Sequence, residues 1–200
     1  MGRKSLVAVR RLEILEHFYH LIIEEGLEGA STVKLSRRMG IRSSLLMHYF
    51  PTKEDMIQAL IVWLMELYEN RFLPMLEEKQ SPEARFETVI DALFSPAWEN
   101  LADGRVFYSC YTLIFRDEGV RARFQQTFAR FHEHLCHEIT RAADAGLIKV
   151  SDPSQSAHIL ISWVEGFNFY QRILADQESF EAQGKIFRRL VENLFREGVH

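Results

Sequence analysis

The sequence predicts an all-α fold, with a small N-terminal head of three helices followed by a larger helical body. Apolar residues recur three and four positions apart in one segment after another, which is the spacing of a helix face. Serine, threonine, glycine and proline residues stand between these segments, where helices begin and end. No segment shows the strict alternation of a β-strand. We expect the head over residues 1–52 and the body over residues 53–200.

The composition is that of a folded globular protein. The 200 residues are 47% hydrophobic and 26% charged, which suits one domain or two small ones. The sequence contains no run of eighteen apolar residues and no apolar N-terminal segment, so we expect neither a membrane span nor a secretory signal. Cys110 and Cys136 form no CxxC pair and are expected to be reduced thiols of a cytoplasmic protein.

The first helix of the head is expected from about Ser5 to Glu25. Leucine, isoleucine and aromatic residues cover a broad face of it, and Gly26 ends it. Arg3 and Lys4 precede this helix on an arm that either follows DNA or is a solvated terminus.

The stretch from Ser31 to Lys53 has the pattern of two short helices joined by a tight turn. Ser31 is a suitable N-cap for the first helix, and Gly40 has the conformational freedom that the turn needs. Ser43 or Ser44 is expected to cap the second helix. Two short helices across a glycine turn form a helix-turn-helix unit, whose second helix enters the major groove of DNA.

The second short helix has one apolar stripe, formed by Leu46 and Phe50 four residues apart. Pro51 ends this helix, and Thr52 begins the next one with Asp55 three residues later, close to a capping box. The exposed face of the second helix is expected to carry Arg42, Ser43, Ser44, Leu45, Met47, His48 and Tyr49. The residues available to DNA phosphates are Arg37, Arg38, Arg42 and Lys53.

Three motifs stand out in this region: Gly26-Leu27-Glu28-Gly29-Ala30-Ser31-Thr32, Met39-Gly40-Ile41 and His48-Tyr49-Phe50-Pro51-Thr52-Lys53. Together they resemble the DNA-binding domain of the TetR family of bacterial transcriptional regulators. The motifs cover about the first quarter of the chain, with a weaker echo at Trp163-Val164-Glu165-Gly166. The resemblance implies a helix-turn-helix DNA-binding domain followed by a helical ligand-binding and dimerisation domain.

The resemblance also implies roles for individual residues. Phosphate contacts fall to Thr32, Tyr49 and Lys53, and the base edges are read by Val33, Ser43, Ser44 and Leu45, with Met47 beside them. The family commonly has a polar residue where Leu45 stands and an aromatic one where Met47 stands, so these two either read DNA or pack in the domain's own core. Val33 can offer only an apolar contact, such as one to a thymine methyl group.

The charge is unevenly distributed along the chain. The net charge of the whole protein is −4, yet residues 1–53 hold nine basic and five acidic residues, a net charge of +4. The remainder carries a net charge of −8. A basic head on an acidic body fits a protein that contacts DNA with one end only.

The body is predicted to be helical throughout. A connecting helix over residues 53–78 is expected to link the head to the body, and Pro74 should kink it or end it early. The other expected helices cover residues 82–94, 105–116, 118–145, 152–176 and 180–197.

The body is rich in aromatic residues. By resemblance, this region holds a small-molecule pocket, and such sites are apolar with a few polar groups. The candidate lining residues are Trp98, Phe107, Tyr108, Tyr111, Phe128, Phe131, Phe167 and Asn168. The alternative is that these rings form a plain aromatic core.

The last two helices are expected, by resemblance, to pair with those of a second copy in a homodimer. The candidate interface residues are Trp163, Gly166, Phe167, Tyr170, Phe187, Leu190 and Leu194. Such a dimer would present two recognition helices to the two halves of a palindromic operator.

The sequence contains no HExxH, no Gly-rich phosphate loop and no GxSxG motif, so we expect no enzyme, no cofactor and no metal site. His132, His134 and His137 cluster on one helix, but an exposed charged face explains them better than metal binding. Two interpretations remain. The first is a repressor that a small-molecule ligand releases from its operator. The second is a DNA-binding protein whose body binds a protein partner or a metal instead.

Overall fold

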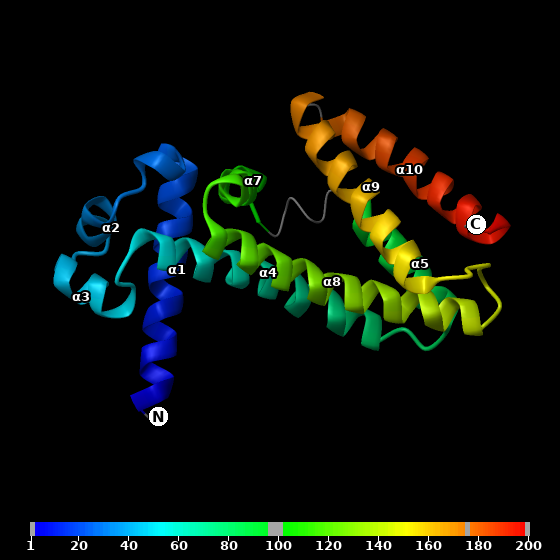
Figure 1. Cartoon of the computed structure of the whole chain (residues 1–200), viewed down its shortest axis with the longest axis horizontal. Helices are drawn as coiled ribbons and strands as arrows, with labels where there is room; N and C mark the ends of the chain where they lie inside the picture. Colours follow the sequence, from blue (N-terminus) through cyan, green and yellow to red (C-terminus); the bar gives the residue numbers. More distant parts are fainter. Residues whose placement is uncertain (1–2, 96–101, 175–176, 199–200) are drawn as a thin grey trace. The chain divides into compact units, whose positions relative to one another are not determined.

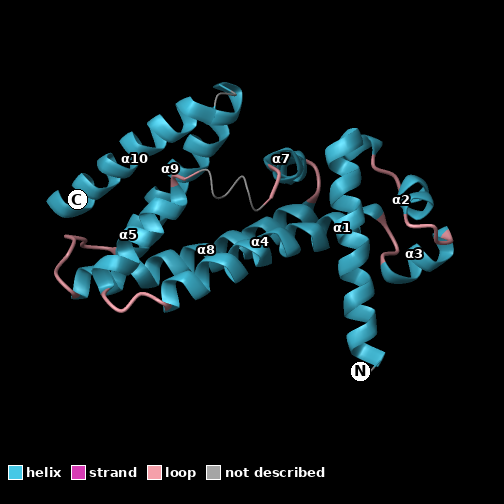
Figure 2. Ribbon diagram, turned by 180° about the vertical axis from the view of Figure 1, so that it is seen from behind, coloured by secondary structure: helices cyan, strands magenta, loops and turns pink. Residues whose placement is uncertain are grey.

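The computed structural model describes residues 3–95, 102–174 and 177–198, and it confirms the all-α fold (Figure 1). Trp98, predicted to line a ligand site, lies outside the described residues. The helices are α1 (Arg3–Gly29), α2 (Thr32–Arg38), α3 (Ser43–Tyr49), α4 (Lys53–Glu77), α5 (Pro82–Leu93), α7 (Gly104–Tyr111), the 3₁₀ helix η1 (Thr112–Phe115), α8 (Glu118–Asp144), α9 (Pro153–Leu174) and α10 (Gln177–Glu197). Figure 2 shows these helices and the loops that join them.

The chain divides into two compact units. The first unit comprises Met1–Leu67 and Ala102–Thr127, and the second comprises Tyr68–Leu101 and Phe128–His200. The first unit therefore contains α7, η1 and the beginnings of α4 and α8 in addition to α1, α2 and α3.

The first unit is built around apolar stripes that meet from several helices. Phe18 of α1, Leu35 of α2 and Leu46 of α3 are fully buried, as is Met56 of α4. Within this unit, α2 and α3 lie on one side of α1, and α7 packs against α1 from the other side (Figure 1).

Polar contacts and one close approach fix α7 and α8 within the first unit. The backbone N–H of Asp103 donates to the Tyr19 hydroxyl at 2.6 Å, and the Asp103 carboxylate accepts from the backbone N–H of Arg105 at 2.8 Å. A Cβ at Gly119 would lie 2.5 Å from Gln58 Nε2, so α8 begins in close contact with α4. Elements distant in sequence thus pack against α1 and the first part of α4.

The second unit has an aromatic centre. The ring of Phe167 on α9 lies 5.5 Å from Phe94, 5.0 Å from Phe180 and 4.9 Å from Phe187, measured between centroids. A Cβ at Gly184 would lie 2.3 Å from the Phe94 carbonyl oxygen, so α10 crosses the end of α5 with no room for a side chain. These rings form a packed core.

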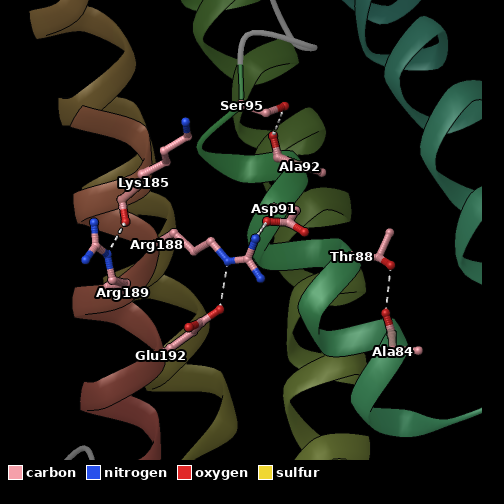
Figure 3. Close-up of polar contacts among 9 residues, drawn as sticks. All are labelled: Ala84, Thr88, Asp91, Ala92, Ser95, Lys185, Arg188, Arg189 and Glu192. Carbon is pink, nitrogen blue, oxygen red and sulfur yellow. Dashed lines mark hydrogen bonds and ion pairs between the residues drawn. The ribbon is translucent and has the colours of Figure 1, made fainter. Parts of the chain in front are cut away.

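Two arginines tie the helices of the second unit together. Arg85 of α5 donates to both carboxylate oxygens of Glu138 on α8, at 2.9 and 2.5 Å, and both side chains are largely buried. Burial by itself would raise the pKa of Glu138, but the hydrogen bonds and charge of Arg85 lower it below its ordinary value. Arg188 of α10 contacts Asp91 of α5 and also bonds Glu192 at 2.8 Å (Figure 3).

The helix boundaries differ from the predicted ones in four places. Helix α1 (Arg3–Gly29) begins two residues earlier than predicted, whereas its regular geometry is interrupted at Gly26, with a φ of 73°, where the sequence predicts the helix end. Helix α4 runs through Pro74 to Glu77, so Pro74 does not end it early. The segment after Tyr111 tightens into η1 instead of continuing as an α-helix.

The fourth difference concerns the start of α3. Its N-cap is Arg42, without a side-chain cap, and Ser43 is the first helical residue, so the prediction that Ser43 or Ser44 caps this helix is wrong. The Ser43 hydroxyl instead pairs with the Ser36 hydroxyl at 3.0 Å. A bond across the turn between the two helices has replaced the cap.

Candidate nucleic-acid interface

The turn between α2 and α3 is locked by short-range contacts. The Ser31 hydroxyl accepts from the backbone N–H of Lys34 at 3.3 Å, as an N-cap does. Gly40 has a φ of 62°, a left-handed conformation that favours glycine at this position. With the Ser36–Ser43 bond across it, this turn holds α3 at a fixed angle to α2.

Helix α3 has one buried and one exposed face. Leu46 is fully buried, as is Phe50 directly after the helix. Residues Ser43, Ser44, Leu45, Met47 and His48 are exposed, and Tyr49 is half-buried. The alternative that Leu45 and Met47 pack in the core of their own domain therefore does not hold. Val33 and Arg42 are exposed as well, and Thr32 is half-buried.

The C-terminal end of α3 is held by Arg11, a residue that the sequence analysis did not single out. Its guanidinium donates to the carbonyl of Tyr49 and lies 4.0 Å from the centre of the Phe50 ring. A cation over an aromatic face is attracted by the electrons of the ring. The available signal was the pair of adjacent arginines, Arg10 and Arg11, in the first helix of the head.

The start of α4 contains the predicted capping box. The Thr52 hydroxyl accepts from the backbone N–H of Asp55 at 3.0 Å, and the Asp55 carboxylate accepts from the backbone N–H of Thr52 at 3.1 Å. The Lys53 ammonium donates to the carbonyl of Leu27 at 2.5 Å. Lys53 therefore joins α4 to α1, and its contact with a DNA phosphate stays a prediction.

The basic residues of this region fall into two groups. Arg38 pairs with Glu24 at 2.6 Å, and Lys34 pairs with Glu25. The hydrogen bond from Arg38 lowers the pKa of Glu24, although burial opposes it. Arg37 and Arg42 are exposed, and neither has a carboxylate partner among the described residues. These two arginines offer full positive charges to a polyanion.

The predicted ligand residues do not gather in one described site. In the first unit, Phe107 and Tyr111 stack at 5.8 Å and meet the Phe124 ring edge-on at 5.6 and 5.1 Å, with Tyr108 beside them. In the second unit, Phe167 belongs to the aromatic core described above. The remaining three residues, Phe128, Phe131 and Asn168, are half-buried in the second unit.

Two surface pockets lie in the second unit. One, of about 300 Å³, has Phe86 and Ile148 among its apolar lining and the carboxylates of Glu83, Glu87 and Glu192 among its polar lining. The other, of about 250 Å³, lies where α10 crosses the end of α5 and includes Asp91, Lys185 and Arg188 (Figure 3). The predicted ligand residues that the structure describes, which leave out Trp98, line neither pocket.

Among the described residues, the half-buried Glu165 and the buried Cys110 have pKa values that are raised mainly by loss of contact with water. Burial raises the pKa of Glu165 on α9 to about 7. Burial also raises the pKa of the Cys110 thiol to about 12, with a small opposing effect of Lys53, so this thiol is inert as a nucleophile.

Helices α9 and α10 carry a set of exposed apolar residues, which we call the α9–α10 surface: Trp163, Tyr170, Ile173, Leu174, Ile186 and Leu190. A Cβ at Gly166 would meet nothing within 4 Å. Phe167 was predicted for the dimer interface, but it is buried in its own unit and is unavailable to a partner chain. Phe187 and Leu194 are half-buried. Ile173 and Leu174 were not predicted for the interface, although their helical spacing was a usable signal.

The clustered histidines of α8 contact different side chains. His132 stacks on His158 with ring centroids 4.1 Å apart, and the His137 ring contacts Arg141. Over the described ranges, no group of three or more histidine, cysteine, aspartate or glutamate side chains is arranged to hold a metal ion. Within the same ranges, every helix is too short or too polar to cross a membrane.

Comparison with known proteins is consistent with this arrangement. Residues 14–60 match the family model for bacterial regulatory proteins of the tetR family, and residues 81–196 match the model for the tetracyclin repressor-like C-terminal domain. A TetR transcription regulator from Haloarcula marismortui superposes with a TM-score of 0.80 at 21% identity, over 93% of this chain and 97% of that one. A regulator from Saccharomonospora viridis in complex with choline superposes with a TM-score of 0.75 at 16% identity, over 90% and 95% of the two chains.

Curated relatives share more of the sequence. The nucleoid occlusion factor SlmA of Vibrio vulnificus is 33% identical over 129 residues, which are 63% of this chain. This match spans 64% of the relative's length. SlmA of Aliivibrio fischeri is 30% identical over 162 residues, which are 78% of this chain and 81% of the relative.

Proposed function

Since the chain belongs to the TetR family and is a DNA-binding regulator of that family, we propose that it is a homodimeric repressor that a small molecule releases from a palindromic operator. The observation that carries this proposal is the exposed face of α3. A short helix with a buried stripe presents Ser44 and His48 outward together with the apolar Leu45 and Met47. Arg37 and Arg42 lie beside it, and neither has a carboxylate partner among the described residues. Such a helix fits the major groove, and the arginines suit phosphates.

The proposed dimer uses the α9–α10 surface. On α9, the exposed residues Trp163, Tyr170 and Ile173 recur at helical spacing and therefore share one face with Gly166. Large exposed apolar groups of this kind mark interaction sites in soluble proteins. A second copy of the same surface, related by a two-fold axis, would cover them. The two α3 helices would then bind half-sites about one helical turn of DNA apart, or a multiple of it.

Release by a ligand would be a shift between two conformations of the dimer. A ligand that binds better to the conformation with wrongly spaced recognition helices weakens operator binding by that difference in affinity. The choline bound by the Saccharomonospora viridis regulator supports a small-molecule effector for a protein of this fold. We expect no catalytic step in this cycle.

The test is binding of the purified protein to DNA from upstream of its own gene, over a series of salt concentrations. Saturable binding that resists competitor DNA, followed by release with a small molecule from a screened library, is the expected result. Binding that shows no sequence preference at any salt concentration, here and in selections from random DNA, would contradict the proposal.

A role in nucleoid occlusion is a second candidate, favoured by the two SlmA relatives. It fits the interpretation in which the body binds a protein partner. Deletion of the gene distinguishes the two roles. Septa that form over unsegregated nucleoids would favour nucleoid occlusion, whereas a changed level of one or a few transcripts with normal division would favour the repressor.

A further inference from the structure

Three exposed aliphatic or thioether side chains lie on the helix-turn-helix itself. Val33 of α2 is 57% exposed, and Leu45 and Met47 of α3 are 40% and 53% exposed. The residues around them are short or polar, and the buried stripe of α3 is complete without them. These three side chains are therefore free to contact a partner of the helix-turn-helix.

Leu45 and Met47 lie on either side of the most exposed face of α3. At 100° per residue, Ser44 and His48 stand opposite the buried Leu46 and Phe50, and Leu45 and Met47 flank them on the two sides. A partner that meets the centre of this face meets the two apolar side chains as well.

Few hydrogen-bonding groups remain on this face to read bases. The Ser43 hydroxyl is engaged by Ser36, at 3.0 Å. Ser44 and His48 remain, together with Arg42 at the N-cap. The exposed face of α3 contains no asparagine or glutamine, the side chains that pair with adenine in the major groove.

The apolar feature of the major groove is the C5-methyl group of thymine. Building on the proposed DNA-binding function, we infer that this protein selects its operator half-sites mainly through thymine methyl groups, which Leu45, Met47 and Val33 contact. The unpaired arginines, Arg37 and Arg42, favour a polyanion over an apolar protein groove as the occupant of this face. Ser44 and His48 add hydrogen bonds to neighbouring base edges.

The test replaces thymine by deoxyuridine, which removes the methyl group and leaves the base pair intact. The preferred sequence is first selected from random DNA with the full-length protein. Single replacements within a half-site should then weaken binding by about three- to fivefold at each contacted position, the effect of leaving one methyl group unburied. Replacements in the flanking DNA are the control and should change nothing.

Protein variants assign each methyl group to a side chain. In Leu45→Ala and Met47→Ala, the deoxyuridine effect should disappear at one position each and persist at the others. Phe115→Ala is the matched control, because Phe115 is 87% exposed in the same unit but lies outside the helix-turn-helix. Circular dichroism confirms that each variant is folded.

The outcomes separate this inference from the proposed function. A selected sequence whose affinity does not respond to deoxyuridine at any half-site position would overturn the inference and leave the regulator intact. A selection that enriches no sequence would overturn both. An undiminished deoxyuridine effect in Leu45→Ala, Met47→Ala and Val33→Ala would also overturn the inference.

Discussion

The helix-turn-helix and the α9–α10 surface both expose apolar side chains, and they differ in what surrounds those side chains. On the helix-turn-helix, Val33, Leu45 and Met47 stand singly among polar residues and next to Arg37 and Arg42. On the α9–α10 surface, large apolar residues follow one another at helical spacing. Exposure alone does not identify a partner. The residues next to the exposed side chains indicate a DNA groove as the partner of the helix-turn-helix and a second copy of the chain as the partner of the α9–α10 surface.

The α9–α10 surface exists only if the second unit is folded, and we expect the largest loss of stability when the Glu138 carboxylate is removed. Glu138→Ala should lower the free energy of unfolding by about 3–5 kcal/mol, because it leaves the Arg85 guanidinium buried without its partner. Chemical denaturation measures the loss. The exposed Glu133→Ala on the same helix is the control and should stay within about 0.5 kcal/mol of the unmodified protein.

The same pair predicts a response to acid. Since the pKa of Glu138 is lowered in the folded state, its stabilising contribution is present above the ordinary glutamate pKa of 4.5 and is lost as the pH falls through the lowered value. The acid-dependent part of the unfolding free energy should therefore be smaller in Glu138→Ala. Equal acid sensitivity of the two proteins would show that the pair contributes nothing of this kind.

Gly166→Leu changes the shape of the α9–α10 surface and should weaken the proposed dimer. Because a Cβ at Gly166 would meet nothing within 4 Å and the position is exposed, the fold should tolerate the leucine. The dissociation constant of the dimer should rise about tenfold to a hundredfold, ~1.4–2.7 kcal/mol. Sedimentation equilibrium measures this constant. Gln125→Leu adds the same side chain at an exposed position of α8 and should leave the dimer unchanged. A Gly166→Leu protein with normal dimer affinity would remove α9 from the interface.

Glu165, the neighbour of Gly166 on α9, provides a pH-dependent test of which side of this helix is shielded from water. Its folded pKa of about 7 lies above the ordinary 4.5, so folding is penalised as the pH rises from about 4.5, and the penalty is complete above about 7. Glu165→Gln should therefore be more stable than the unmodified protein at pH 8, by roughly 1–2 kcal/mol, and similar to it near pH 4.5. A stability difference that does not vary between these pH values would contradict the burial of this carboxylate.

The smallest expected effect concerns the charges of the DNA-binding surface. Arg42→Ala should lower the slope of log affinity against log salt by about 1, since one phosphate contact is lost. Arg38→Ala should change the slope less, because Arg38 is paired with Glu24 in the free protein. Lys185→Ala on α10 is the control and should leave the slope unchanged. Equal slopes for Arg38→Ala and Arg42→Ala would show that the ion pair opens freely on DNA.

The sequence predicts the helices well because their caps and stripes are local. Ser31, Gly40 and the Thr52–Asp55 capping box take the positions and contacts expected of them. The Ser36–Ser43 bond and the contact between Tyr19 and Asp103 join residues of different structural elements, and no local sequence pattern predicts them. Phe167 shows the same limit. Its helix is apolar nearly all round, so periodicity does not say which face is covered by the chain itself and which awaits a partner.

The most direct test of the account is the number of protein chains bound to one duplex that carries the selected palindrome, measured by native mass spectrometry or sedimentation. We expect two chains on the palindrome and much weaker binding to an isolated half-site. We also expect that Leu45→Ala lowers the preference for the selected sequence without changing the stoichiometry, while Gly166→Leu impairs assembly of the two-chain complex. A single chain that binds a half-site as tightly as the palindrome would contradict the assignment of the two surfaces to DNA and to a second copy.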